Sequence, residues 1–232
     1  MPPSANSRCL QDLSVLTVNA VGPKAAHPKS LRWQLTAKRS LDIVFSLTGL
    51  AILLPLLILV AAMIKFDSKG PIFFSQRRWG MGGQIINVWK FRSMYVDKCD
   101  ASGVAQTTEN DPRVTAVGKL IRRLNIDELP QLFNVLRGDM SLVGPRCHAV
   151  GMLAAGTLYE ELVPQYHERH VMRPGLTGLA QARGWRGPTD TPAKARSRVA
   201  CDLFYVENFS VRLDIAIMLK TLHNELTDGR GF

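Results

Sequence analysis

Asp127 and Glu128 are two adjacent carboxylates that stand among arginines, directly before an apolar stretch. Pro130 is tolerated in the first turn of a helix but not in its interior, so we predict that both carboxylates lie at a helix N-terminus. Free N–H groups and the positive end of the helix dipole gather there, and the place suits anions such as the phosphates of a ligand. Four arginines bracket the pair: Arg122, Arg123, Arg137 and Arg146.

The same stretch also admits a purely structural interpretation. Either carboxylate could cap the helix while the arginines serve as solvated partners. The helix is predicted from apolar residues spaced i, i+3, i+4 and i+7, and Gly138 is expected to end it. The residues expected to form one buried face are Leu129, Leu132, Phe133 and Leu136.

The composition points to an anionic partner. The chain has 232 residues, enough for one or two domains with a sizeable core. Lys and Arg number 29 against 19 Asp and Glu, and a net charge of +10 suits nucleic acid, anionic lipid or a phosphorylated substrate equally well. Four scattered cysteines without zinc-like spacing favour reduced thiols in the cytosol.

One apolar run, from Ile43 to Ile64, is long enough to cross a bilayer. A plain transmembrane span is the simplest interpretation, but Pro55 in mid-run should bend the helix. Basic residues also lie on both sides of the run, whereas a span normally has a one-sided bias. We therefore favour a bent helix that enters one leaflet and returns. The flanking basic residues are Lys38, Arg39, Lys65, Lys69, Arg77 and Arg78.

Differences in composition along the chain suggest how it is divided into segments. The N-terminal part is rich in proline, shows little periodicity and does not resemble a signal peptide. The predicted plan is a mostly disordered extension at 1–37, a re-entrant membrane helix at 38–66, a cytoplasmic catalytic domain at 67–226 and a tail at 227–232. The fold class that follows is α+β, mainly helical, with a short β-hairpin and interfacial amphipathic helices.

Basic residues are interleaved with two predicted strands, 72–74 and 85–89, which form a hairpin around the turn at 80–83. Their side chains could point into one anion site or rest against lipid headgroups, and spacing does not decide. The residues concerned are Gln76, Arg78, Lys90 and Arg92. We expect a polar loop at 97–110 and a helix at 116–123.

Two later segments also leave alternatives open. Arg173-Pro174-Gly175-Leu176-Thr177-Gly178 predicts a loop whose backbone approaches either a phosphate or nucleotide, or another part of the chain in a tight turn. Residues 194–226 are amphipathic and complete the core or lie in the membrane interface, and we favour the core.

In this order the motifs resemble those of the bacterial sugar transferase family, the monotopic phosphoglycosyl transferases, over residues 38–226. The matching motifs are Lys38-Arg39 with Asp42 before the Pro55-bent run, Gln76-x-Arg78-x-Gly80, Lys90-Phe91-Arg92-Ser93-Met94, Asp111-Pro112-Arg113-Val114, Asp127-Glu128-Leu129-Pro130-Gln131-Leu132, 138–146 (Gly-Asp-Met-Ser-Leu-Val-Gly-Pro-Arg) and 173–178.

The resemblance implies a re-entrant membrane helix with both ends in the cytoplasm, at the inner membrane of a bacterium. It also implies transfer of a sugar 1-phosphate from a UDP-sugar to undecaprenyl phosphate, with release of UMP, to initiate exopolysaccharide or another surface glycan. Asp127 would be the nucleophile and Glu128 would help to hold Mg²⁺. The substrate-binding residues would be Gln76, Arg78, Lys90, Arg92, Arg122, Arg146 and Arg173, and those at the membrane Lys38, Arg39, Asp42 and Pro55.

This chemistry agrees with the residue types. An aspartate can attack phosphorus once the charge of the diphosphate is screened, and Mg²⁺ with arginines would screen it. We expect the same arginines to favour the ionised form of Asp127. Departures from the family pattern are Cys147, where a proline is usual, and the segment 182–186 (Ala-Arg-Gly-Trp-Arg); we assign no role to Arg183 or Arg186.

Two other functions remain as alternatives. A membrane-associated glycosyltransferase would release UDP in place of UMP. A non-catalytic protein binding anionic lipid or nucleic acid would not need Asp127 or Glu128, and an acidic pair should repel a polyanion, so we expect no nucleic-acid partner. The sequence does not name the sugar, and it leaves the oligomeric state open, a homodimer included.

Overall fold

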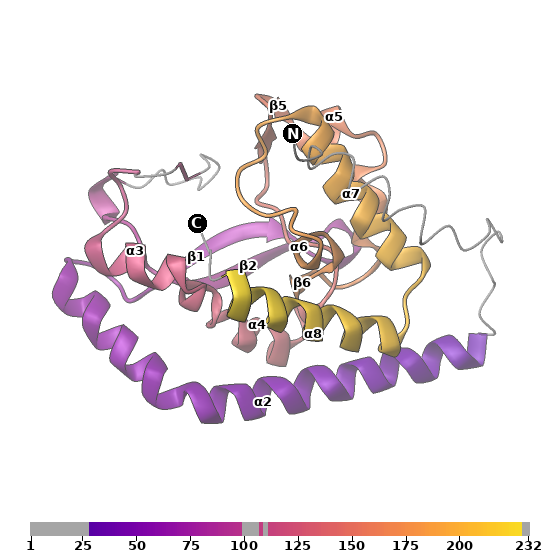
Figure 1. Cartoon of the computed structure of the whole chain (residues 1–232), viewed down its shortest axis with the longest axis horizontal. Coiled ribbons are helices and arrows are strands. Elements are labelled where there is room, and N and C mark those ends of the chain that lie inside the picture. Colours follow the sequence, from indigo (N-terminus) through magenta and orange to yellow (C-terminus); the bar gives the residue numbers. More distant parts are fainter. Residues whose placement is uncertain (1–27, 99–106, 109–110, 229–232) are drawn as a thin grey trace. The chain divides into compact units, whose positions relative to one another are not determined.

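The computed structural model describes residues 28–98, 107–108 and 111–228. The chain divides into two compact units, Met1–Trp33 and Gln34–Phe232. The helices, strands and 3-10 turns (η) are shown in Figure 1 and run in the order α2 (Pro28–Asp67), β1 (Phe73–Trp79), η1 (Met81–Gly83), β2 (Ile85–Phe91), η2 (Val96–Lys98), α3 (Ala116–Arg123), η3 (Ile126–Glu128), α4 (Gln131–Arg137), β3 (Ser141–Val143), β4 (Leu153–Ala154), β5 (Thr157–Leu158), α5 (Tyr159–Leu162), η4 (Tyr166–Val171), β6 (Gly175–Thr177), α6 (Leu179–Ala182), α7 (Pro192–Glu207) and α8 (Val211–Asp228). The predicted class, mainly helical with a short hairpin, is confirmed.

The long helix α2 contains Pro55, and its ribbon changes direction part-way along (Figure 1). It begins at Pro28, ahead of the predicted boundary at Lys38. Residues 1–27, which belong to the extension predicted to be disordered, lie outside the described residues. Among the described helices, one, Arg32–Asp67, is long and apolar enough to cross a membrane by length and composition.

Lys38 and Arg39, predicted to flank the membrane run, both form hydrogen bonds with residues of later helices. Lys38 is buried, and its Nζ donates to Asp214 Oδ2 at 2.7 Å. Arg39 donates to the carbonyl oxygens of Val135 and Leu136 at 2.6 and 2.8 Å, at the end of α4. These cations therefore fix α2 to the domain, which satisfies charges and carbonyls that would otherwise lack partners.

Asp42 makes the third polar attachment of α2. Its carboxylate is buried and accepts hydrogen bonds from Ser141 Oγ at 2.8 Å and from the Leu142 N–H at 2.9 Å. Both donors belong to β3, so the contact joins α2 to a strand about one hundred residues later. A buried carboxylate with two donors is stabilising, whereas removing it would leave both donors unpaired.

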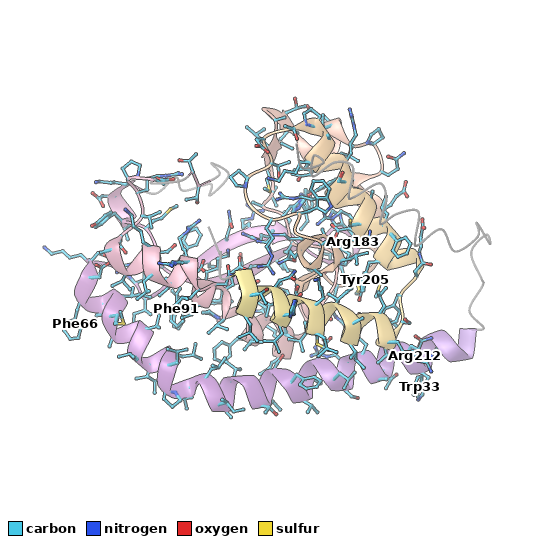
Figure 2. The ribbon with its side chains drawn as sticks, viewed as in Figure 1. Trp33, Phe66, Phe91, Arg183, Tyr205 and Arg212 are labelled. Carbon is cyan, nitrogen blue, oxygen red and sulfur yellow. The ribbon has the colours of Figure 1, made fainter. Side chains whose placement is uncertain are left out.

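The opposite face of α2 is apolar and exposed. Its outward residues include Ile52, which is 72% exposed, while Leu57, Val60 and Ile64 pack inward in one cluster with other elements. Phe66, 90% exposed, points away from the body of the second unit (Figure 2). From Ile43 onward, the exposed large apolar residues of α2 are Ile43, Val44, Phe45, Leu47, Ile52, Leu54, Ile58, Leu59 and Phe66.

The predicted hairpin is confirmed, and its strands are longer than expected. β1 and β2 pair antiparallel, from Phe73 opposite Phe91 to Trp79 opposite Ile85. Since side chains alternate along a strand and directly paired residues share a face, one face of the hairpin carries three of the predicted site residues. They are Gln76, Arg78 and Lys90.

The helix after the carboxylates differs from its prediction in two ways. α4 begins at Gln131 with Pro130 as its N-cap, so Asp127 lies before it, in the separate turn η3. Phe133 was expected inside but is 53% exposed, whereas Asn134 is buried. The reason is that the Asn134 side chain acts as a partner for β2: its Oδ1 accepts the Trp89 N–H at 3.0 Å.

The glycines of the two Gly-Pro motifs pack against each other. β3 and β6 pair in parallel, with Ser141 opposite Gly175. A Cβ on Gly144 would lie 2.4 Å from the Arg173 carbonyl oxygen, and one on Gly178 would lie 2.3 Å from the Gly144 carbonyl oxygen. Of the two alternatives for residues 173–178, the tight approach to another part of the chain therefore accounts for these glycines.

The segment predicted as one amphipathic stretch at 194–226 forms two helices, α7 and α8, with a break at 208–210. Cys201 and Tyr205 of α7 pack with Ile217 of α8 and Val143 in one buried cluster, which agrees with the predicted role in the core. One stripe of α8 remains exposed and consists of Ile215, Leu219, Leu222 and Leu226.

We predict that Asp42→Ala lowers the free energy of unfolding by about 3 kcal/mol, because Ser141 Oγ and the Leu142 N–H lose their acceptor. Urea unfolding of the detergent-solubilised protein would measure it. Ser40→Ala, at an exposed position on the same helix, serves as the matched control and should change little. Equal stability of the two variants would show that the Asp42 contacts do not hold α2 to the domain.

Candidate active site

A cavity of about 1200 Å³ opens beside Asp127 and Glu128. Its walls come from the hairpin, η3, α8 and the segments after β3 and α6. Apolar side chains from several elements, such as Leu129, Met218 and Leu222, form part of the lining. The cavity brings together most of the polar residues predicted for the site: Gln76, Arg78, Lys90, Arg92, Arg122, Asp127, Glu128 and Arg146.

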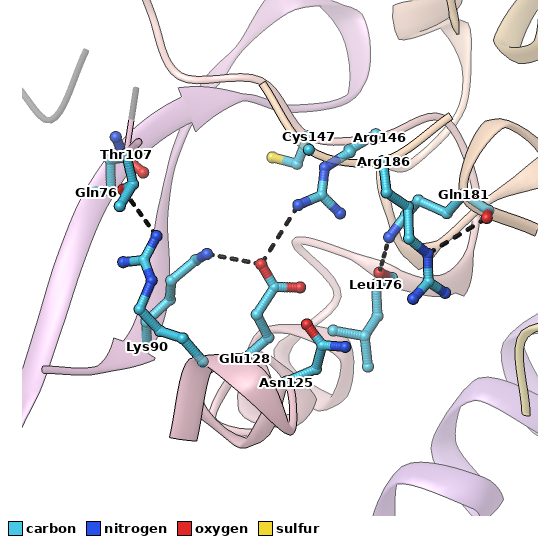
Figure 3. A network of polar contacts seen from close by, with 12 residues as sticks. Gln76, Lys90, Thr107, Asn125, Glu128, Arg146, Cys147, Leu176, Gln181 and Arg186 are labelled. Carbon is cyan, nitrogen blue, oxygen red and sulfur yellow. Dashed lines mark hydrogen bonds and ion pairs between the residues drawn. The ribbon is translucent and has the colours of Figure 1, made fainter. Parts of the chain in front are cut away.

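Glu128 is held by two cations through one of its oxygens. Lys90 Nζ lies 2.7 Å from Oε1, and Arg146 Nη2 lies 3.4 Å from the same atom. Figure 3 shows both contacts and the second oxygen turned away from Lys90. Burial alone would raise the pKa of Glu128, but the charges of Lys90 and Arg146 outweigh it and lower that pKa. Glu128 is therefore ionised at neutral pH.

Asp127 has a different electrostatic environment from its neighbour. Its side chain lines the cavity although the residue is only 6% exposed. Burial, with a smaller contribution from the charge of Glu128, raises the pKa of Asp127, while Lys90 and Arg122 act in the opposite direction. Lys90 and Arg122 thus favour the ionised form of Asp127, as expected of nearby cations, but burial outweighs them and the pKa of Asp127 is raised.

Arg78 and Gln76 form a fixed pair on the hairpin. The Nε and Nη2 of Arg78 donate to Gln76 Oε1 at 3.0 and 2.8 Å, and its Nη1 donates to the Cys147 carbonyl at 2.7 Å. Burial lowers the pKa of Arg78, yet arginine remains charged at neutral pH. Its guanidinium is therefore pre-oriented in the cavity wall.

Arg122 reaches the cavity from α3. Its Nη2 donates to Thr107 Oγ1 at 2.7 Å and its Nη1 to Ser93 Oγ at 3.2 Å. Neither partner carries a charge, so this guanidinium keeps its full positive charge available to a ligand. Together with Lys90 and Arg146 it surrounds the two carboxylates from different elements.

Arg92 and Arg173 have other partners. Arg92 donates to the carbonyls of Ile64, Ser68 and Lys69 at 2.5–3.1 Å, and so caps the C-terminal end of α2. Arg173 donates through Nε to the Gly138 carbonyl at 2.8 Å and does not belong to the described lining of the cavity. Substrate binding by these two residues stays a prediction, while their contacts here are structural.

Four polar residues on the cavity lining had no role assigned from the sequence and make notable contacts. His148 is buried, its Nδ1 lies 3.2 Å from Tyr166 Oη, and burial lowers its pKa well below the ordinary value, so the ring is neutral at pH 7. Asn125, Arg186 and Glu225 meet at another part of the wall. No short-range signal marks the last three, because their contacts join positions 39 to 100 residues apart.

Comparison with known proteins identifies the chain. The family model described as bacterial sugar transferase matches residues 33–228. The chain belongs to the bacterial sugar transferase family. The match covers α2 from Trp33, the hairpin and the whole cavity described above.

Three relatives of this bacterial sugar transferase show how far the similarity extends. An exopolysaccharide production protein (PSS) of Rhizobium leguminosarum bv. phaseoli is 62% identical over 85% of this chain and 99% of the relative. An undecaprenyl-phosphate glucose phosphotransferase of Komagataeibacter xylinus is 48% identical over 86% of this chain, which spans 38% of that longer protein. A UDP-glucose:undecaprenyl-phosphate glucose-1-phosphate transferase of Caulobacter vibrioides is 44% identical over 94% of this chain and 78% of the relative.

The carboxylates of this sugar transferase suit a particular kind of cation. Within the described residues, no group of three or more His, Cys, Asp and Glu side chains gathers as a metal site. Asp127 and Glu128 together offer two carboxylates at the cavity, one oxygen of Glu128 being committed to Lys90 and Arg146. This donor set fits Mg²⁺, which binds through one or two carboxylates and takes its other ligands from phosphates and water.

We predict that Lys90→Met destabilises the transferase by about 3 kcal/mol at pH 7, measured by urea unfolding in EDTA, because Glu128 then stays charged and buried with a weaker partner. The lowered pKa of Glu128 in wild type contributes stability above its unfolded value of about 4.3, and that contribution is lost as pH falls through the folded pKa. Removing Lys90 should raise the pKa of Glu128 in the folded protein, so the stability gap should be fully present at pH 7 and narrow as pH falls through the raised pKa.

The double variant Lys90→Met with Glu128→Gln is the matched control. It removes both charges and should regain part of the lost stability. A stability gap that does not change with pH, or a double variant no more stable than Lys90→Met alone, would contradict the assignment of the ion pair.

Proposed function

We propose that this protein transfers a sugar 1-phosphate from a UDP-sugar to undecaprenyl phosphate and releases UMP, as the initiating step of exopolysaccharide or other surface-glycan synthesis. The observation that carries the proposal is the carboxylate pair, Asp127 and Glu128, surrounded by cations at a large cavity. The names of the relatives supply the substrate class. Because two of them name glucose, UDP-glucose is the first donor to test.

The cations of the cavity suit a diphosphate. Arg78 is already oriented by Gln76 and a carbonyl, Arg122 donates to the hydroxyls of Ser93 and Thr107, and Arg146 is partly committed to Glu128. Guanidinium groups bind phosphate oxygens with paired donors, and in a site of low polarity such contacts are stronger than in water. These residues would hold the two phosphates of the donor and place the sugar-bearing phosphorus near Asp127.

Asp127 would act as the nucleophile of the first half-reaction. A carboxylate oxygen forms a bond to the phosphorus that carries the sugar, and the bond from that phosphorus to the bridging oxygen breaks, with the electron pair leaving on UMP. The raised pKa means that the attacking oxygen is more basic than that of an ordinary aspartate, and hence a stronger nucleophile once ionised. In the second half-reaction a phosphate oxygen of undecaprenyl phosphate attacks the same phosphorus and releases Asp127.

Glu128 would help to hold Mg²⁺ together with phosphate oxygens of the donor. The cation, when bound, supplies charge screening between the carboxylates and the diphosphate. Lys90 would keep Glu128 ionised and in place, because it binds Oε1 and leaves the second carboxylate oxygen of Glu128 turned away from it (Figure 3).

We predict that wild type, incubated with UDP-glucose labelled in the sugar and its phosphate and with Mg²⁺ but no lipid acceptor, retains label on the protein and releases one UMP per adduct. Asp127→Asn should lose both, because an amide oxygen does not attack phosphorus at a comparable rate. Protein-bound label after denaturing filtration and chromatography of the nucleotide would measure the two products. With undecaprenyl phosphate added, the label should move to lipid.

Asp97→Asn, at an exposed position outside the described cavity lining, is the matched control and should behave as wild type. Label on Asp127→Asn equal to wild type would exclude Asp127 as nucleophile. Release of UDP in place of UMP would favour a glycosyltransferase, and salt-sensitive lipid binding without any turnover would favour a non-catalytic protein.

We propose further that α2 is re-entrant, with both ends on the cytoplasmic face of the inner membrane. Its outward face is apolar over the length of the run, while its inward face is bound to the domain both before and after Pro55, by Asp42 and by Ile64. A straight span would carry one of these two attachment points across the bilayer, away from the domain. A bent helix keeps both on one side.

This arrangement predicts the labelling of two cysteines placed at exposed positions beside the run, Ser40→Cys and Lys69→Cys, in a background lacking the four native cysteines. Both should resist a membrane-impermeant maleimide in intact spheroplasts and react after permeabilisation. Glu207→Cys, on the surface of the domain, is the reference for the cytoplasmic side. Reaction of one of the two in intact spheroplasts would identify a span.

A further inference from the structure

Asn125 begins the turn that carries the two carboxylates, and it does so in an unusual conformation. Its φ of 53° and ψ of 18° are left-handed, and in the described part of the chain one other non-glycine residue has a positive φ. The Asn125 carbonyl accepts the Glu128 N–H at 3.3 Å, so the direction of its backbone sets the direction of η3. Asparagine adopts this conformation more readily than other non-glycine residues, and here it directly follows the C-cap of α3, with its N–H donating to the Arg122 carbonyl at 3.1 Å.

The side chain of Asn125 is bound to a distant helix. An asparagine before a helical turn usually caps that turn, but this one makes no capping hydrogen bond. Its Nδ2 instead donates to Glu225 Oε2 at 2.8 Å, near the C-terminal end of α8. The Asn125 side chain therefore joins the junction of α3 and η3 to α8 and does not cap the turn.

Glu225 is itself fixed on its other side. Its Oε1 forms an ion pair with Arg186, whose Nε donates to the Gln181 carbonyl at 3.3 Å. The neighbouring Asn224 donates to the Ala182 carbonyl at 2.9 Å, so the end of α8 is attached to α6 at two places. Figure 3 shows Asn125 beside the turn of Glu128, and Arg186 with its bond to Gln181 in the same network.

We propose that Glu225 is a positioning residue, which anchors Asn125 at the junction of α3 and η3 and thereby orients Asp127 and Glu128 toward the cavity. Glu225 lies on the wall of the same cavity but touches neither carboxylate in the described contacts. Its effect passes through the backbone of Asn125 and the turn that follows. The proposal rests on the proposed function only in taking Asp127 as the reacting group.

The test compares Glu225→Ala with Glu225→Gln in single-turnover formation of the phosphosugar adduct from UDP-glucose. Glu225→Ala should lower the maximal rate on the order of tenfold with little change in the UDP-glucose concentration for half-maximal rate, because orientation and not binding is lost. Glu225→Gln keeps an oxygen that can accept from Asn125 and should retain most of the rate. Glu207→Ala, an exposed glutamate of α7, is the control for stability and expression.

A second comparison tests whether Glu225 acts on the carboxylates through Asn125. Asn125→Gly removes the side chain while leaving a residue that adopts φ of 53° without strain, and it should itself lower the rate. Because Glu225 acts through Asn125, Glu225→Ala should lower the rate less than twofold further in the Asn125→Gly background. Arg186→Ala should have a smaller effect than Glu225→Ala, since the bond to Asn125 remains.

Three results would overturn the proposal: an unchanged rate in Glu225→Ala, equal losses in Glu225→Gln and Glu225→Ala, or the same factor in both backgrounds. Each can be read while wild type forms the adduct and Asp127→Asn does not, so that failure here is distinct from failure of the proposed function. If wild type forms no adduct with any UDP-sugar, the proposed function fails and the positioning role fails with it.

Discussion

One carboxylate oxygen, Oε1 of Glu128, joins three segments that are far apart in the sequence. Lys90 approaches it from the hairpin and Arg146 from the segment after β3, while Glu128 itself belongs to η3. A charge in a mostly buried position is tolerated only with partners, so this contact requires all three segments to be in place at once. The cavity is formed where they meet.

The same contact separates the properties of two adjacent carboxylates. Glu128 has its pKa lowered by Lys90 and Arg146, whereas burial raises the pKa of Asp127. Neighbouring acids whose pKa values are displaced in opposite directions can take different chemical roles, one as a permanent anion and the other as a more basic group. The division proposed here, Asp127 as nucleophile and Glu128 as an anionic ligand, follows that electrostatic difference.

The sequence predicted elements better than it predicted partners. Apolar residues interleaved with basic ones were enough to place the hairpin, and the turn at 111–115 placed the start of α3, because both signals are local. The buried face of α4 was missed at Phe133 because Asn134 turns inward to bond β2, a contact between positions 45 residues apart. Local patterns contain no information about such a partner.

The basic residues show the same limit for the site. Arg78, Lys90, Arg92 and Arg146 do line the cavity, as their motifs suggested, but the hydrogen bonds of Arg92 go to carbonyls at the end of α2. Arg173 lies outside the described lining and binds the Gly138 carbonyl. A guanidinium in a motif can serve a ligand or a helix end, since both offer oxygen acceptors. Only the fold distinguishes the two, and the same holds for Lys38 and Arg39.

The cap that Arg92 forms on α2 has a mechanical consequence. Arg92 follows Lys90 by two residues, directly after β2. It donates to the carbonyls of Ile64, Ser68 and Lys69 at the C-terminal end of α2, the helix that we propose is re-entrant. Movement of the hairpin along that helix would therefore break the Arg92 hydrogen bonds. In a re-entrant arrangement, the depth of α2 among the acyl chains would therefore determine how far the reacting carboxylates lie from the lipid phosphates.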